Sequence, residues 1–106
     1  MADTYEWPIG SGQSLEFEIH DQNENWSDAP GLYIFAYLSG GTWKAVYAGQ
    51  ADSLQARLPN HERLDEAVRE GATHIHVMIV RQQSQREVWA QALIRHLRPP
   101  LNMQFA

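Results

Sequence analysis

The order of apolar and polar positions along the chain predicts a strand, a hairpin and a further strand. Residues 15–19 alternate apolar and charged side chains, as in a strand with one buried face. An apolar run over 31–39, the pair Gly40-Gly41 and a second strand-like run over 42–49 predict a hairpin. Residues 73–81 predict another strand, because β-branched side chains occupy every second position from Thr73 to Ile79. These segments indicate a small antiparallel sheet.

Helix-forming segments follow the hairpin and the last strand. Residues 53–58 predict a short helix that Pro59 interrupts, and residues 60–70 predict a second helix with Gly71 just past its end. The expected buried stripe of this second helix consists of Leu64, Ala67 and Val68. A last helix is expected to begin at Ser84 and to stop before Pro99. Its expected buried face consists of Val88, Trp89, Ala92, Leu93, His96 and Leu97.

The order of these elements predicts an α/β (α+β) fold, with a small three-stranded antiparallel sheet flanked by helices. Residues 1–30 are polar and are expected to form an acidic N-terminal extension with one short strand. Residues 31–106 are expected to form the functional domain. A chain of 106 residues is long enough for one domain with a modest core.

Charge is distributed unevenly along the chain. The net charge is -5, which by itself disfavours a nucleic-acid partner. Residues 1–30 contain acidic residues and no lysine or arginine, whereas all 8 basic residues lie in 31–106. The body of the chain is therefore slightly positive, and the acidic extension is interpreted either as a solvated edge segment or as a mask over a basic surface.

Composition limits the remaining classes of protein. The chain has no cysteine, so disulfides and thiolate metal sites are excluded. No apolar run approaches the roughly 20 residues that a membrane span requires, and the N-terminus offers no basic-then-apolar signal. We expect a cytoplasmic protein.

Two tripeptides on the predicted hairpin stand out, Gly-Leu-Tyr at 31–33 and Tyr-Ala-Gly at 47–49. After them come Arg57 on the short helix, Glu87 near the start of the last helix and Asn102 after the prolines. In this order and over this length the sequence resembles the GIY-YIG nuclease superfamily, as a small stand-alone member. Leucine and alanine replace the two central isoleucines of the motif, while both tyrosines and both glycines are kept.

The resemblance implies a metal-dependent DNA endonuclease that hydrolyses phosphodiester bonds. It implies that Glu87 holds one Mg²⁺ or Mn²⁺, a hard cation that prefers carboxylate oxygens. Arg57 would bind the phosphate oxygens, because its guanidinium is planar and permanently charged. Tyr33 would be the general base and Tyr47 would orient the water or the phosphate.

Two further residues complete the expected site. A phenol is a poor base at neutral pH without help from a nearby cation or proton acceptor. His61 is the candidate helper, four residues after Arg57. Asn102 would hydrogen-bond near the site and help to fix the metal ligand.

Each candidate also has a structural interpretation. Tyr33 and Tyr47 are typical half-buried strand residues, and Arg57 and His61 are typical surface residues. Ser84 and Glu87 together match a capping box, which would give Glu87 a purely local role. Asn102 has the alternative of a helix-exit turn residue, and a zinc site at His74 and His76 lacks a third ligand.

Three function classes therefore stay open from the sequence alone. The first is the nuclease, and the second is a nucleic-acid binding or structure-sensing module that has lost cleavage. The third is a protein-binding module whose acidic extension pairs with a basic partner. A homodimer or a larger complex that supplies recognition is open as well.

A shared site places a condition on the hairpin. A regular two-residue turn at Gly40-Gly41 would pair Tyr33 with Ala48 and put Tyr33 and Tyr47 on opposite faces of the sheet. We therefore predict either a loop of odd length or a β-bulge, which brings both phenols to one face.

Overall fold

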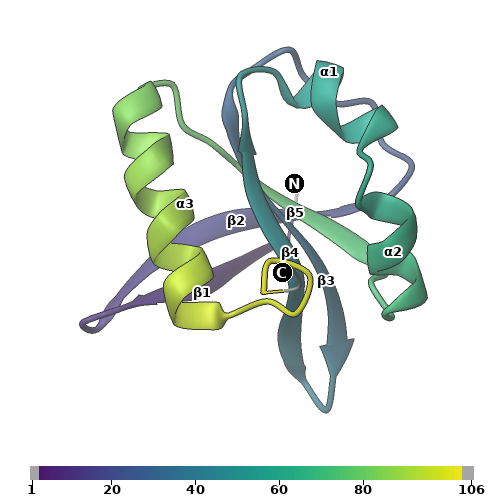
Figure 1. The fold of residues 1–106 in the computed structure, drawn as a ribbon, viewed down its shortest axis with the longest axis horizontal. Helices are drawn as coiled ribbons and strands as arrows, with labels where there is room; N and C mark the ends of the chain where they lie inside the picture. Colours follow the sequence, from purple (N-terminus) through teal and green to yellow (C-terminus); the bar gives the residue numbers. More distant parts are fainter. Residues whose placement is uncertain (1–2, 104–106) are drawn as a thin grey trace.

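The computed structural model describes residues 3–103 and contains one layer of strands with helices on both faces (Figure 1). All five strands belong to one antiparallel sheet in the order β1-β2-β5-β3-β4. The strands are β1 Thr4–Gly10, β2 Gln13–Asp21, β3 Gly31–Ser39, β4 Thr42–Ala51 and β5 His74–Ile79. The helices are α1 Leu54–Arg57, α2 Leu64–Arg69 and α3 Gln83–Leu97, with a 3-10 turn η1 Leu58–Asn60.

The sheet corrects the three-strand prediction. The α+β class and the hairpin of β3 and β4 are confirmed, but the sheet has five strands because β1 and β2 form a second hairpin. This N-terminal hairpin joins the sheet through β2, which pairs with β5. Trp7 of β1 is 2% exposed, so residues of the acidic segment contribute to the core. The division of the chain at residue 30 stays a prediction.

Two hydrophobic clusters lie on opposite faces of the sheet. The first packs α1, η1 and α2 against the odd-numbered side chains of β3, among them Tyr33 and Phe35. The second packs α3 against the even-numbered ones, Leu32, Ile34 and Ala36. Figure 1 shows the same arrangement, with α3 on one side of the strands and α1 and α2 on the other. The aromatic side of β3 therefore lies under helices, where burial of each large side chain stabilises the fold by roughly 1.5–3 kcal/mol.

A β-bulge in β4 sets the register of the functional hairpin. The turn has two residues, because Ser39 pairs with Thr42. Phe35 pairs with Tyr47, but Ala36 pairs with Ala45, so Val46 is an extra residue. The extra residue reverses the side-chain alternation of the rest of β4. Tyr47 consequently lies on the same face as Tyr33, which confirms the condition on the hairpin.

The helices differ in detail from the prediction. Instead of one helix over 60–70, η1 is followed by a break and by α2, and Val68 is 41% exposed whereas Ala67 is buried. α3 begins one residue before Ser84, and no side chain caps it. The predicted capping box is therefore wrong.

The buried face of α3 also differs from the prediction. It includes Arg86, Ala90 and Leu93, while Val88 is 61% exposed and His96 is exposed. Trp89 is partly buried against the second cluster. No helix within residues 3–103 is long and apolar enough to cross a membrane.

Candidate functional site

The site begins with a buried pair formed by Tyr33 and His61. Tyr33 is 1% exposed and His61 is 6% exposed, and Tyr33 Oη lies 2.7 Å from His61 Nε2. Burial raises the pKa of the Tyr33 phenol well above its ordinary value, with Tyr47 adding to the increase and Arg57 opposing it. Burial also lowers the pKa of His61 to about 4, with the Arg57 charge as a second cause. Both groups are neutral at neutral pH.

A backbone amide selects the tautomer of His61. The N–H of Arg63 donates to His61 Nδ1 at 3.0 Å, so Nδ1 must carry a lone pair. In a neutral imidazole the proton is then on Nε2. His61 therefore donates to Tyr33 Oη, and the hydroxyl hydrogen of Tyr33 is left for another acceptor. A donor of this kind favours the phenolate form of Tyr33.

Tyr47 lies beside this pair and is only partly buried. Its ring centroid is 6.3 Å from that of Tyr33 and 5.3 Å from that of His61. The guanidinium carbon of Arg63 lies 6.0 Å from the Tyr47 ring centroid, within the range of a cation–π contact. Tyr47 is thus the phenol of the site that reaches solvent.

The glycine that ends the second tripeptide leaves space for Tyr33. A Cβ built on Gly49 would lie 2.6 Å from Tyr33 Oη and 2.7 Å from its Cζ. Both distances are far below van der Waals contact. Gly31 is constrained in the same way, since its Cβ would lie 2.5 Å from the Met78 carbonyl oxygen. Both glycines are needed for close approach.

Arg57 is held by a neighbouring carboxylate. Its two terminal nitrogens donate to the two carboxylate oxygens of Glu62 at 2.7 and 2.9 Å. The guanidinium lowers the pKa of Glu62 to about 2. The side chain of Arg57 is 38% exposed, so it remains accessible from solvent. The Arg57 guanidinium thus lies near the Tyr33–His61 pair. An anionic ligand would have to displace Glu62 in order to bind it.

Asn102 binds the backbone of β4. Its Oδ1 accepts from the Ala48 N–H at 2.8 Å, and its Nδ2 donates to the Ala48 carbonyl at 2.9 Å. The N–H of Leu101 donates to the carbonyl of the bulge residue Val46 at 3.1 Å. The C-terminal segment therefore fixes the strand on both sides of Tyr47.

Comparisons with known proteins bear on this geometry. No family model and no curated protein sequence matches the chain significantly. Solved structures of the GIY-YIG N-terminal endonuclease domain of UvrC from Thermotoga maritima do match. The magnesium-bound domain matches at 26% identity and TM-score 0.57, over 70% of this chain and 83% of that one. A point mutant bound to its catalytic divalent cation matches equally at 26%, over 70% and 82%.

This chain has a GIY-YIG-like fold. The resemblance seen in the two tripeptides is therefore confirmed at the level of structure. In this GIY-YIG-like fold the isoleucine positions of the motif hold Leu32 and Ala48, which are both buried in the α3 cluster. Their replacement changes packing on the face of the sheet opposite to the two phenols.

Glu87 lies apart from the residues above. It is exposed near the start of α3, just after the first turn, and within residues 3–103 its carboxylate bonds only to Gln83 Nε2, at 3.2 Å. α3 packs on the other face of the sheet from Tyr33. The structure thus joins Tyr33, Tyr47, His61 and Arg57 in one site, and leaves Glu87 outside the contacts of that site.

A buried arginine connects the turn that carries Glu87 to the end of β4. Arg86 is 4% exposed, donates to the carbonyls of Val80 and Arg81, and pairs with Asp52 at 2.8 Å. Asp52 directly follows β4 and is 94% exposed at its side chain. The sequence did not predict the contact between Arg86 and Asp52, because a buried arginine cannot be recognised from the pattern of hydrophobic residues.

The available carboxylates fit a magnesium ion that is held by few protein ligands, rather than a site in which the protein supplies every ligand. Within the described part of the chain no group of three His, Cys, Asp or Glu side chains gathers. Mg²⁺ usually keeps several waters and uses one or two carboxylates together with substrate phosphates. An exposed carboxylate such as that of Glu87 meets that requirement. His76 is buried and accepts from Trp7 Nε1 at 2.9 Å, which gives it a structural partner in place of zinc.

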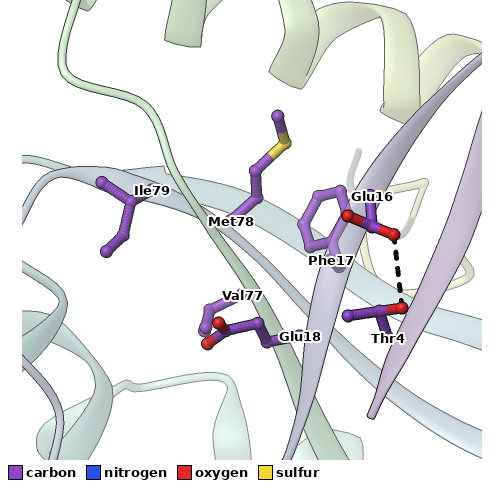
Figure 2. Close-up of a pocket in the computed structure, with 7 residues that line it drawn as sticks. All are labelled: Thr4, Glu16, Phe17, Glu18, Val77, Met78 and Ile79. Atoms are coloured by element: carbon purple, nitrogen blue, oxygen red, sulfur yellow. Dashed lines mark hydrogen bonds between the residues drawn. The ribbon is translucent and has the colours of Figure 1, made fainter. Parts of the chain in front are cut away.

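Two pockets lie beside the sheet, one at the end of β4 and one against β1, β2 and β5. A pocket of about 380 Å³ opens beside Arg57 between the end of β4 and α1. Another, of about 220 Å³, lies on the N-terminal side of the sheet, where Thr4 Oγ1 donates to Glu16 at 3.3 Å (Figure 2). Its lining contains two carboxylates and no basic side chain, so it is unsuited to a phosphate. It is lined by Thr4, Glu16, Phe17, Glu18, Val77, Met78 and Ile79.

Proposed function

We propose that the chain is a divalent-metal-dependent endonuclease that hydrolyses DNA phosphodiester bonds. The observation that carries the proposal is the cluster of Tyr33, His61 and Tyr47 beside Arg57, on a fold like that of an endonuclease domain bound to magnesium. Two phenols, an imidazole and a guanidinium supply proton transfer and charge stabilisation in one place.

The burial of Tyr33 changes the roles that the two tyrosines have in this proposal. Tyr33 is almost fully buried and its pKa is raised, so it is poorly suited to remove a proton from water. Tyr47 is partly exposed and lies against the same histidine. We therefore assign the position facing the attacking water to Tyr47. Tyr33 becomes a positioning residue that His61 orients.

Arg57 and Glu87 have the charged roles. Arg57 would leave Glu62 and bind the phosphate oxygens, which stabilises the charge of the transition state. Glu87 would hold the metal through its exposed carboxylate, and the metal would supply further neutralisation of phosphate charge when bound. Arg86 would keep the first turn of α3 near the end of β4, and Asn102 would keep Ala48 and hence Tyr47 in place.

A second candidate is nucleic-acid binding without cleavage. The observation that favours it is the bidentate Arg57–Glu62 pair, which occupies the guanidinium on both nitrogens. A module of this kind would bind DNA with any metal or none.

The test is cleavage of mixed DNA substrates with and without a divalent metal, using Glu87→Gln. Glutamine has nearly the shape of glutamate but lacks the charge that holds a hard dication. Because Glu87 is exposed and bonds only to Gln83 in residues 3–103, we expect an unchanged melting temperature and no detectable cleavage. Asp65→Asn, an exposed residue of α2, is the control with the same change of charge.

Two results would contradict the proposal. Glu87→Gln cutting at the wild-type rate would remove Glu87 from the site. A wild type that binds DNA but cuts no substrate with Mg²⁺ or Mn²⁺ would leave the binding module as the function.

A further inference from the structure

A pocket with the chemistry of a nucleotide site lies at the outer edge of β4, near the turn of its hairpin. It has a volume of about 340 Å³ and combines aromatic rings with two basic side chains. Trp43 and Tyr37 line it and are partly exposed, and Lys44 and Arg98 line it and are exposed. The full lining is Trp7, Tyr37, Trp43, Lys44, Ala45, Val46, Glu70, Leu97, Arg98 and Pro100.

The aromatic part of this pocket, which we call the Trp43 pocket, is packed against neighbouring rings. The ring of Trp43 packs edge-on against His76 at a centroid distance of 4.5 Å and against His74 at 5.2 Å. Trp7 is buried and hydrogen-bonded to His76. A ring that is fixed before binding loses little entropy when a base stacks on it.

The charged part of the pocket favours an anion. Lys44 and Arg98 form no ion pair with any carboxylate in residues 3–103, and Glu70 is the acidic residue of the lining. Two cations against one anion leave a net positive charge. A phosphate group is the anion that would accompany a stacked base.

The backbone of Arg98 gives an independent reason to assign a function to this pocket. Arg98 ends α3 in the left-handed conformation, with φ 48° and ψ 57°. Glycine is the usual residue there, because a side chain makes this conformation unfavourable. The sequence places an arginine at that position, and Arg98 lines the same pocket as Lys44.

The pocket extends around the edge of the sheet: Lys44 pairs with Tyr37 on the face of Tyr47, whereas Trp43 packs in the α3 cluster on the opposite face. Lys44 pairs with Tyr37 and Tyr47 pairs with Phe35, so across the bulge the two residues are separated by two strand positions, or about 7 Å. Stacked nucleotides are spaced by about 3.4 Å along one strand, so this distance corresponds to about two nucleotides. The bulge at Val46 lines the pocket and also directs Tyr47 to the face of the cluster.

We infer that the Trp43 pocket binds an unpaired nucleotide of the DNA strand that enters the site, by stacking its base on Trp43 and by contacting its phosphate with Lys44 and Arg98. The choice of DNA as the ligand rests on the proposed function. It predicts a preference for substrates with a single-stranded or displaced nucleotide next to the cut.

The test is equilibrium binding of a fluorescent oligothymidine in EDTA, where cleavage is absent, at several salt concentrations. Trp43→Leu should weaken binding roughly tenfold, because stacking is lost, whereas Trp43→Phe should bind more nearly like the wild type. Arg98→Gly should reduce the slope of log affinity against log salt by about 0.7, the change for one lost phosphate contact. It should not lower the melting temperature, since glycine relieves the backbone.

The matched control is Arg95→Gln, in the same last turn of α3 but outside the lining of the Trp43 pocket. It removes the same charge from the helix end and should leave the salt slope nearly unchanged. Equal slopes for Arg98→Gly and Arg95→Gln would overturn the inference, as would wild-type affinity in Trp43→Leu. An oligothymidine that the wild type does not bind would overturn it too.

Cleavage by the wild type separates the two proposals. A wild type that cuts DNA while the Trp43 and Arg98 variants bind normally would overturn only the pocket. A wild type that binds through the pocket but cuts nothing would overturn only the nuclease.

Discussion

Gly49→Ala is expected to damage the proposed site through one methyl group. The backbone of Gly49 lies outside the left-handed region, and such a Gly→Ala change normally stabilises a protein by about 0.4–1 kcal/mol. Here the new Cβ would lie 2.6 Å from Tyr33 Oη and 2.7 Å from Cζ. Carbon atoms in contact are about 3.5–4.0 Å apart, so the phenol must move by about 1 Å.

The cost of this movement can be worked out from the contacts. Overpacking of a buried site typically costs about 1–3 kcal/mol, and Tyr33 is 1% exposed. The movement also breaks the 2.7 Å bond between Tyr33 Oη and His61 Nε2. A displacement of about 1 Å in a catalytic arrangement lowers the rate by about 10². We therefore expect lower stability in urea unfolding and slower metal-dependent cleavage.

A double variant isolates the contact. Tyr33→Phe removes the closest atom and the bond to His61 that holds the ring, so the ring can shift away from the new methyl group, and Gly49→Ala should destabilise the Tyr33→Phe background less than it destabilises the wild type. The expected coupling is about 0.5–3 kcal/mol. A Gly49→Ala variant as stable and as active as the wild type would refute the packing of Tyr33 described above.

Two further predictions concern the charges around the sheet. Burial lowers the pKa of His76 to about 4 against 6.5 in the unfolded chain, so its contribution is intact above pH 6.5 and is lost as the pH falls toward 4. When the pH falls from 7 to 4.5, the free energy of unfolding measured in urea should decrease by about 2 kcal/mol more in the wild type than in His76→Asn. Equal decreases in the two proteins would contradict this. Glu62→Gln removes the bidentate partner of Arg57 and should tighten DNA binding several-fold at low salt. Weaker binding would instead make Glu62 a residue that positions Arg57.

The hairpin and the tripeptides were predictable because they depend on local signals. The glycine pair, the apolar run over 31–39 and the two tyrosines give both the turn and the pairing of β3 with β4. The requirement for a shared face predicted either a loop of odd length or a bulge, and the structure has the bulge. Its position at Val46 was not predictable, because it depends on the Leu101 N–H that binds the Val46 carbonyl from a distant part of the chain.

The errors arise where tertiary contacts override pattern. The polar pattern of residues 1–30 gives no prediction of β1, since Trp7 stands among polar residues and turn-forming residues and no apolar alternation surrounds it. The capping box failed because α3 begins at Gln83, where Arg86 ties the first turn to Val80, Arg81 and Asp52. Glu62 and Arg63 were not singled out, because their partners Arg57 and Tyr47 become neighbours only in the folded chain.

The closure of β4 by the C-terminal segment has a consequence for aggregation. An open edge strand offers unpaired N–H and C=O groups to strands of other molecules. Leu101 and Asn102 bind such groups on Val46 and Ala48, so this edge is protected beside the functional tyrosines. At the opposite edge, Pro8 removes one donor from β1. Contacts between copies of this chain are therefore expected to use side chains rather than a continued sheet, and a chain truncated before Leu101 should precipitate more readily.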